Sequence, residues 1–250
     1  MGIGNKILTA FVFAAMIVLF VCKKEEAPVP QIVGTKYSGF DQSIYKKPGT
    51  TSKTEFVTTV YGMEEVTGLE IVNHEGLDAK GNKTVTEYLK LKTVDNKEGY
   101  APSKNFFEAV LFAVGDGDQA FVKNSLTSPT KGKLERGMYC FEIESNGDFA
   151  KVNCYGSILK NGKLNNLLGI WIQPNSPTLS KDPLLGDSLR NLKAASATLI
   201  ELAKAGDDTA KQDKLKAEAS KTLKTVADKG DQFLEDANAL ATEFGLSLTE

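Results

Sequence analysis

Histidine and cysteine are the scarce reactive residues of this chain, which has one histidine, His74, and three cysteines, Cys22, Cys140 and Cys154. A catalytic zinc site usually needs two or three imidazoles, and the cysteines show no Cys-x-x-Cys spacing. His74 lies in a polar stretch, and neither Cys140 nor Cys154 opens a helix, the usual way to activate a nucleophilic thiol. We therefore expect no metal, no cofactor and no Cys–His peptidase site.

One short motif has the letters of an enzyme signature. Gly186-Asp187-Ser188-Leu189 spells the nucleophile block of a hydrolase family, but that family needs a histidine downstream, and His74 lies upstream. Asp187 is better explained as the N-cap of a helix, because its side chain can accept from a free backbone N–H. The chain is therefore predicted to have no catalytic residues and not to be an enzyme.

The charge balance argues against nucleic acid as a partner. The chain has 30 basic and 32 acidic residues, for a formal net charge of −2. Binding to nucleic acid needs a basic surface, which this balance does not supply. The composition is otherwise that of an ordinary globular protein, and 250 residues suffice for two domains with sizeable cores.

Residues 1–21 have the parts of a signal peptide. Lys6 supplies a short basic start, and residues 7–21 are apolar except for Thr9. A helix of this length reaches about 22 Å, short of the roughly 30 Å hydrocarbon core of a membrane. An exported segment is therefore predicted. A short uncleaved anchor and an ordinary secreted protein are the alternatives.

The apolar run stops at Cys22, and Leu19-Phe20-Val21-Cys22 resembles the lipobox of spirochaetal lipoproteins. This resemblance implies cleavage before Cys22 and acylation of that cysteine, palmitate included. Residues 22–31, polar and then proline-rich, would be the lipidated tether. The implied partner is the membrane, and the implied location is the cell envelope, on the periplasmic or the surface face of the outer membrane.

From residue 32 to about residue 174 the sequence is typical of an all-β region. Short β-branched and aromatic runs alternate with segments rich in Gly, Asn, Asp and Pro, and apolar residues are spaced among polar ones in Thr84–Lys92. Such short strands with frequent turns favour a small barrel or sandwich over a parallel sheet.

The β region also repeats. Ser43–Pro48 has a counterpart in Ala120–Lys123, and Gly99-Tyr100-Ala101 has one in Gly169-Ile170-Trp171-Ile172. The order of a hydrophobic-Lys segment, a loop, a hairpin and a closing glycine-aromatic strand resembles the bacterial SH3-like (SH3b) domain, in tandem. In this resemblance Lys46 stands near the position of a family arginine.

After Pro183 the composition changes to Ala, Leu, Lys, Glu and Asp, with two stripes of apolar residues at helical spacing. Gly206–Thr209 supplies a stop and an N-cap between them, and Lys229–Asp231 is a possible break. We favour stripes that pack within the chain over a coiled-coil surface for a partner. The predicted fold is therefore α+β, with SH3-like barrels at 32–105 and 106–184 and an antiparallel helical hairpin at 185–250.

Ser145-Asn146-Gly147-Asp148 predicts a type I′ turn with Asn146 and Gly147 at its centre. The resulting register places Cys140 and Cys154 on opposite faces of a β-hairpin. A disulfide between them would need a one-residue bulge, so two free thiols are favoured.

The resemblance implies binding of cell-wall peptide or of an envelope protein. Rigid aromatic side chains would line the groove: Tyr45, Tyr61 and Tyr100 in the first barrel, and Tyr139 and Trp171 in the second. The alternative is that these rings fill small cores, above all Tyr139 and Trp171. The competing function is that of a structural or assembly lipoprotein, with partner contacts on the C-terminal helices and barrels that act as spacers.

Overall fold

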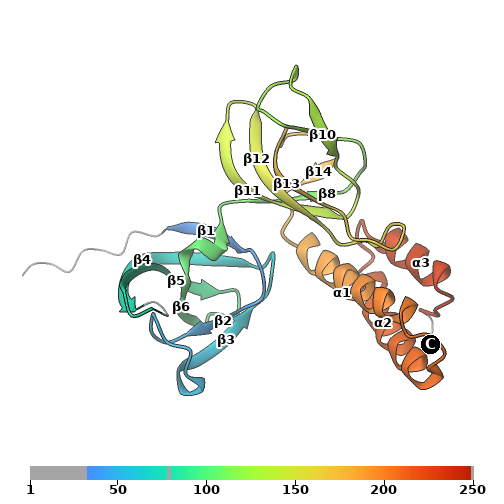
Figure 1. The fold of residues 1–250 in the computed structure, drawn as a ribbon, viewed down its shortest axis with the longest axis horizontal. Helices are drawn as coiled ribbons and strands as arrows, with labels where there is room; N and C mark the ends of the chain where they lie inside the picture. Colours follow the sequence, from blue (N-terminus) through green and yellow to red (C-terminus); the bar gives the residue numbers. More distant parts are fainter. Residues whose placement is uncertain (1–32, 78–79, 249–250) are drawn as a thin grey trace, which may run out of the picture. The chain divides into compact units, whose positions relative to one another are not determined.

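The fold is known from a computed structural model that describes residues 33–77 and 80–248. The predicted signal peptide (1–21), Cys22 and the tether (22–31) lie outside the described residues. Within the described part, two curled antiparallel sheets and three α-helices form an α+β fold, as predicted (Figure 1).

The first sheet has seven strands in the spatial order β3-β2-β6-β5-β4-β1-β7. Alternation sets its inner face: in β5, Leu89 and Leu91 are buried while Lys90 between them is half-buried on the other face. The strands are β1 (Gly34–Ser38), β2 (Gln42–Tyr45), β3 (Phe56–Val60), β4 (Glu65–Leu77), β5 (Lys83–Thr93), β6 (Glu98–Pro102) and β7 (Phe106–Phe107), with 3-10 turns at Lys53–Glu55 and Ser103–Asn105.

The second sheet has seven strands in the order β10-β9-β13-β12-β11-β8-β14. Each strand of the first sheet thus has a counterpart seven strands later, so the repeat seen in the sequence is a repeat of topology. The strands are β8 (Val110–Ala113), β9 (Gln119–Phe121), β10 (Thr130–Lys133), β11 (Met138–Asn146), β12 (Phe149–Gly156), β13 (Asn166–Ile172) and β14 (Leu179–Ser180).

Cys140 and Cys154 form a disulfide, so the prediction of two free thiols is wrong. The two residues lie directly opposite each other on β11 and β12, with their Cα atoms 4.0 Å apart. The register shifts between Glu142 and Glu144, which is the one-residue bulge that a disulfide requires. Both cysteines are fully buried in the apolar core of the second sheet.

The C-terminal region contains α1 (Leu185–Ala203), α2 (Thr209–Lys229) and α3 (Leu234–Glu243), where a two-helix hairpin was predicted. Asp208 caps α2 by accepting from the backbone N–H of Lys211. Gly230 ends α2 with a left-handed φ of 62°, so the possible break is real. The apolar stripes are buried within the chain, in one cluster with the inner aromatic residues of β11.

Asp187 is not the N-cap of α1, because the helix begins at Leu185. It lies in the first turn instead, where Arg190 donates a hydrogen bond to its Oδ1 at 3.0 Å and Lys229 donates to its Oδ2. Burial raises the pKa of this carboxyl, but Lys229 and Arg190 outweigh burial and hold the pKa below its ordinary value.

The lowered pKa of Asp187 predicts a pH dependence of folding. A carboxyl with a depressed folded-state pKa stabilises the fold above its unfolded pKa, near 4, and loses that contribution as the pH falls through the folded value. We expect Asp187→Asn to lower the free energy of unfolding at pH 7 by about 0.2–1 kcal/mol, the range for exposed ion pairs. Urea unfolding at pH 7 and at pH 2.5 measures this. A difference of equal size at both pH values would contradict the assignment.

Candidate functional site

Three aromatic side chains form a row across neighbouring strands of the first sheet. The register pairs Tyr45 of β2 with Phe56 of β3 on one side and with Tyr100 of β6 on the other. Directly paired residues share one face of a sheet, so the three rings lie side by side. The rings of Tyr45 and Phe56 meet edge to face with centroids 6.3 Å apart. We call Tyr45, Phe56 and Tyr100 the aromatic row.

The aromatic row faces away from the core of the first sheet. Its chain neighbours Ile44 and Ala101 are buried in that core, at 0% and 1% exposure. The rings themselves lie outside the core cluster: Phe56 is 44% exposed, and Tyr45 and Tyr100 are half-buried. Core filling, the alternative interpretation of such rings, therefore does not account for Tyr45 and Tyr100.

Gly99 allows β6 to approach β2 closely enough to bring Tyr100 beside Tyr45. A Cβ atom on Gly99 would lie 2.5 Å from Ile44 Cγ2 and 2.7 Å from the carbonyl oxygen of Tyr45. Only glycine fits this contact. The glycine of the closing glycine-aromatic motif thus has a packing reason in this sheet.

The segment from β2 to β3, beside the Tyr45 and Phe56 end of the row, is basic. Residues 42–60 contain three lysines, Lys46, Lys47 and Lys53, and a single carboxylate, Glu55. Lys47 approaches Glu55 at 3.7 Å, whereas Lys46 donates to the backbone oxygen of Thr54 at 3.4 Å. Within the described residues, neither Lys46 nor Lys53 forms an ion pair.

The second sheet carries an equivalent row with a different composition. Trp171 of β13 pairs with Phe121 of β9 and with Lys151 of β12, as Tyr100 pairs with Tyr45 and Lys90. Lys151 Nζ lies 5.9 Å from the centroid of the Trp171 ring.

This second row is less open than the first. Phe121 is only 6% exposed, and the position of Phe56 is taken by Thr130. Trp171 is half-buried and lies outside the core clusters.

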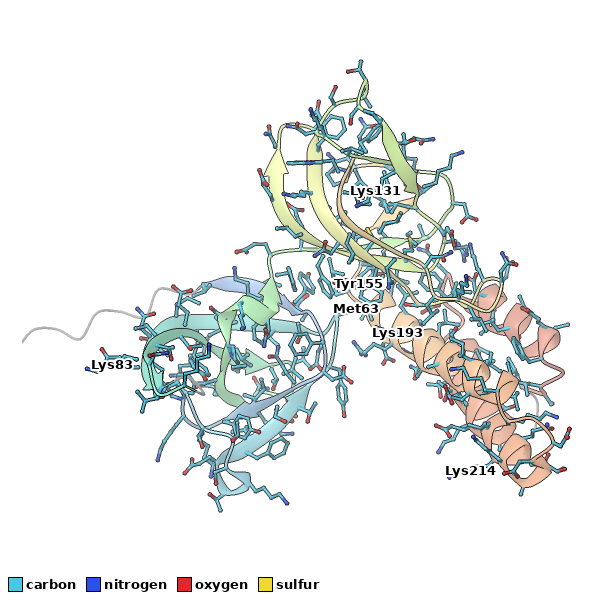
Figure 2. All side chains as sticks on the ribbon, in the orientation of Figure 1. Met63, Lys83, Lys131, Tyr155, Lys193 and Lys214 are labelled. Carbon is cyan, nitrogen blue, oxygen red and sulfur yellow. A yellow bond between two sulfur atoms is a disulfide. The ribbon has the colours of Figure 1, made fainter. Side chains whose placement is uncertain are left out.

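Tyr139 and Tyr61 lie away from both rows. Tyr139 is 4% exposed and belongs to the core, where its ring stacks on Tyr155 with centroids 5.6 Å apart. Lys193 of α1 donates to its hydroxyl at 2.6 Å (Figure 2). Tyr61 follows β3 and is 52% exposed, but no strand pairing aligns it with the aromatic row. Of the five predicted aromatic residues, the structure brings together Tyr45 and Tyr100.

A cleft of 520 Å³ lies where loops of the first sheet meet α1. Its walls include Phe40, Met63 and the ring of Tyr139, together with Arg190 and Lys193 of α1 (Figure 2). Arg190 is occupied by the backbone oxygen of Gly62, to which it donates at 2.8 Å. The cleft is therefore mainly part of the contact between the first sheet and α1.

Residues 8–236 match the family model described as Lipoprotein LenA. The chain belongs to the Lipoprotein LenA family. The match spans both sheets and reaches into α3, so it concerns nearly the whole chain. Membership in this family makes the protein a bacterial lipoprotein, associated with a membrane of the cell envelope.

Two further findings concern membrane-spanning helices and similarity to curated proteins. Among residues 33–77 and 80–248, no helix is both long and apolar enough to cross a membrane. A comparison with curated proteins gives no match.

Proposed function

We propose that this lipoprotein is a non-enzymatic binding protein of the cell envelope, whose first sheet binds a segment of cell-wall peptide or of a protein partner. The observation that carries the proposal is the aromatic row, in which Tyr45, Phe56 and Tyr100 are aligned by strand pairing and face away from the core. Rigid aromatic surfaces of this kind are used to bind extended peptides, because they give contact area at a small entropy cost.

The proposal includes a lipid anchor on Cys22, cut from its signal peptide at a spirochaete-type lipobox. Family membership as a lipoprotein supports it. It also includes the SH3-like identity of the two sheets, which their shared strand order and curled form support. Peptide binding is a common use of small curled β-sheets with aromatic grooves.

The anchor predicts a definite intact mass for the protein extracted from bacterial membranes. We expect the mass of a chain lacking residues 1–21 and carrying a diacylglycerol and a fatty acyl group on Cys22. Mass spectrometry of the extracted protein measures this, and a Cys22→Ser variant is the control that should keep its unmodified leader. An unmodified full-length mass for the natural sequence would contradict lipidation.

Removing the aromatic row predicts a loss of binding. We expect the double substitution Tyr45→Ala and Tyr100→Ala to weaken binding to purified cell-wall peptide or to the purified partner by about 30-fold or more, as for an interface hot spot. Tyr61→Ala is the matched control, since it removes an exposed tyrosine of the same sheet outside the row. Equal binding by the double variant, still folded by circular dichroism, would contradict the proposal.

The alternative is an assembly role with partner contacts on the helices. The apolar stripes of α1, α2 and α3 are already buried within the chain, so the outer face of α2, with the exposed Lys214, would have to carry such contacts (Figure 2). Charge reversal at Lys214 and Lys221 should then abolish binding. It should have no effect if the aromatic row is the site.

The absence of catalysis is part of the proposal, and the neighbours of the reactive residues support it. Ser188 of the Gly-Asp-Ser-Leu motif is fully buried, and its hydroxyl donates to the carboxylate of Asp231. Cys140 and Cys154 are joined in the disulfide, so neither offers a free thiolate. The ring of His74 packs against Tyr88 with centroids 5.9 Å apart.

A further inference from the structure

The two sheets share one strand order but differ at equivalent edges. In the first sheet the edge strand is β3, which has a neighbour, β2, on one side only (Figure 1). Its sequence, Phe-Val-Thr-Thr-Val, contains no charged residue, proline or glycine. An edge of this kind presents unpaired backbone N–H and C=O groups to any extended chain with which it can pair.

The equivalent edge of the second sheet is protected. Its strand β10 reads Thr-Lys-Gly-Lys, and the register shifts between Thr130 and Gly132, which marks a bulge at Lys131. Lys131 folds back and donates to the carbonyl oxygen of Leu168 at 3.0 Å (Figure 2). Lysines and bulges are the devices by which proteins prevent strand addition at an edge. Both edge strands have a bulge at the equivalent position, Lys131 in β10 and Val57 in β3, but only β10 has lysines. The lysines are therefore what distinguishes the two edges.

The open edge and the aromatic row meet at Phe56. This residue is the first of β3, it is 44% exposed, and it ends the row that runs through Tyr45. A chain that pairs with β3 would place every second side chain on the face of the row. One of these side chains would lie directly beside Phe56, so backbone pairing and aromatic contact would select the same segment.

The lysines near the Phe56 end of β3 indicate which kind of peptide segment would pair with this edge. Lys53 stands just before β3, and Lys46 is tied to the same end because its backbone N–H donates to the carbonyl oxygen of Glu55. Among the described residues neither lysine has a carboxylate partner. The chain as a whole carries a formal charge of −2, so this local excess of positive charge is a property of the loop. It is complementary to an acidic segment.

We propose that β3 receives an extended acidic peptide of a protein partner as an additional strand of the first sheet. An apolar or aromatic side chain of that peptide packs on Phe56, and its carboxylates lie near Lys46 and Lys53. This inference rests on the proposed function, since it names the chemistry of the partner bound at the aromatic row. A second copy of this chain, paired through its own β3, is the competing occupant.

Hydrogen exchange of the full-length protein tests the inference. The probe is a ten-residue synthetic peptide in which glutamates alternate with Phe, Thr and Val, and the control peptide has lysine in place of each glutamate. We expect amides of Phe56–Val60 to exchange at least tenfold more slowly with the acidic peptide, and amides of β10 to be unchanged. The lysine peptide should have no effect.

Two variants separate this inference from the proposed function. Val57→Lys with Thr59→Lys gives β3 the lysines that β10 has, and should abolish the protection by the acidic peptide while Tyr45 and Tyr100 remain in place. Protection that survives Tyr45→Ala with Tyr100→Ala would support the edge and overturn the role of the row.

The remaining outcomes overturn the inference. If the acidic peptide binds and Tyr45→Ala with Tyr100→Ala abolishes binding, yet β3 amides are not protected, the row binds peptide without strand addition. If the acidic peptide does not bind while cell-wall peptide does, the proposed function stands and the acidic partner is wrong. If β3 amides are protected without any peptide and sedimentation shows a dimer, the occupant is a second copy.

Discussion

Replacing Cys140 and Cys154 together by alanine is expected to lower the free energy of unfolding by about 3 kcal/mol. The disulfide joins β11 to β12 across a sequence separation of 14 residues, so its loss increases the conformational freedom of the unfolded chain. Both sulfur-bearing residues are fully buried in the core of the second sheet, with Val152 and Met138 in the same cluster. Urea unfolding of the natural sequence and of the double variant measures the effect.

Reductant supplies the control for this prediction. It should shift the unfolding midpoint of the natural sequence toward that of the double variant, and it should leave the double variant unchanged. Titration of the unfolded, non-reduced protein with a thiol reagent should detect no thiol from Cys140 or Cys154. Detection of both thiols would contradict the disulfide.

The register of the β11–β12 hairpin shows why the sequence did not predict this bond. The predicted turn had Asn146 and Gly147 at its centre, but Asn146 pairs with Phe149, and Gly147, with a φ of 58°, is the first central residue. Moving the turn by one residue along the chain shifts the cross-strand partner of every β11 residue by two positions, so each side chain stays on the same face of the hairpin. The moved turn alone would place Cys140 opposite residue 155, and the bulge at Ile143 moves the partner back by one, which brings Cys140 opposite Cys154.

The features that the sequence predicted correctly are those set by interactions between residues close together in the chain. The repeat of strands, the stop at Gly206 and the N-cap at Asp208 all follow from residue types at short spacing, and the structure contains them. A bulge at Ile143 has no such pattern, because a β-branched apolar residue looks the same whether it is in the ladder or bulged. The same holds for the register shift between Ile44 and Tyr45.

The residues of the candidate site also differ in whether short-range sequence patterns could identify them. Tyr45 and Tyr100 were found from the repeated motifs, whereas Phe56 was missed because only the pairing of β2 with β3 aligns it with them. Tyr139 was assigned to a groove but lies in the core. Its face of β11 is covered by α1, whose Lys193 contacts its hydroxyl, and no spacing in the sequence tells which face of a hairpin a distant helix covers.

Replacement of Arg136 is expected to have the second large effect on stability, because this side chain attaches α3 to the second sheet. Its Nε donates to Asp236 Oδ2 at 2.9 Å, and its other nitrogens donate to the backbone oxygens of Val114 and Gln232. The guanidinium also lies 5.3 Å from the centroid of the fully buried Phe233 ring. One side chain therefore joins the end of β8 to the start of α3.

We expect Arg136→Met to lower the free energy of unfolding at pH 7 by about 3 kcal/mol, at the low end for breaking a buried ion pair because both side chains keep some exposure. Hydrogen exchange should show α3 opening before the rest of the fold. Lys224→Met is the matched control. It removes an exposed pair with Asp228 at 3.3 Å, and should cost about 0.5 kcal/mol or less.

The pH dependence of the Arg136→Met variant separates a lost ion pair from lost packing. Burial holds the pKa of Asp236 above its ordinary value although Arg136 opposes the shift, so removal of Arg136 raises that pKa further. A carboxyl with a raised folded-state pKa destabilises the fold as the pH rises through that value, so the deficit of the variant should be smallest below pH 4 and largest at neutral pH. Adding Asp236→Asn should restore part of the stability at pH 7, because no unpaired charge then stays buried. A deficit that is independent of pH and unchanged by Asp236→Asn would mean that Arg136 attaches α3 through its contacts with Phe233 and the backbone oxygens, and not through its charge.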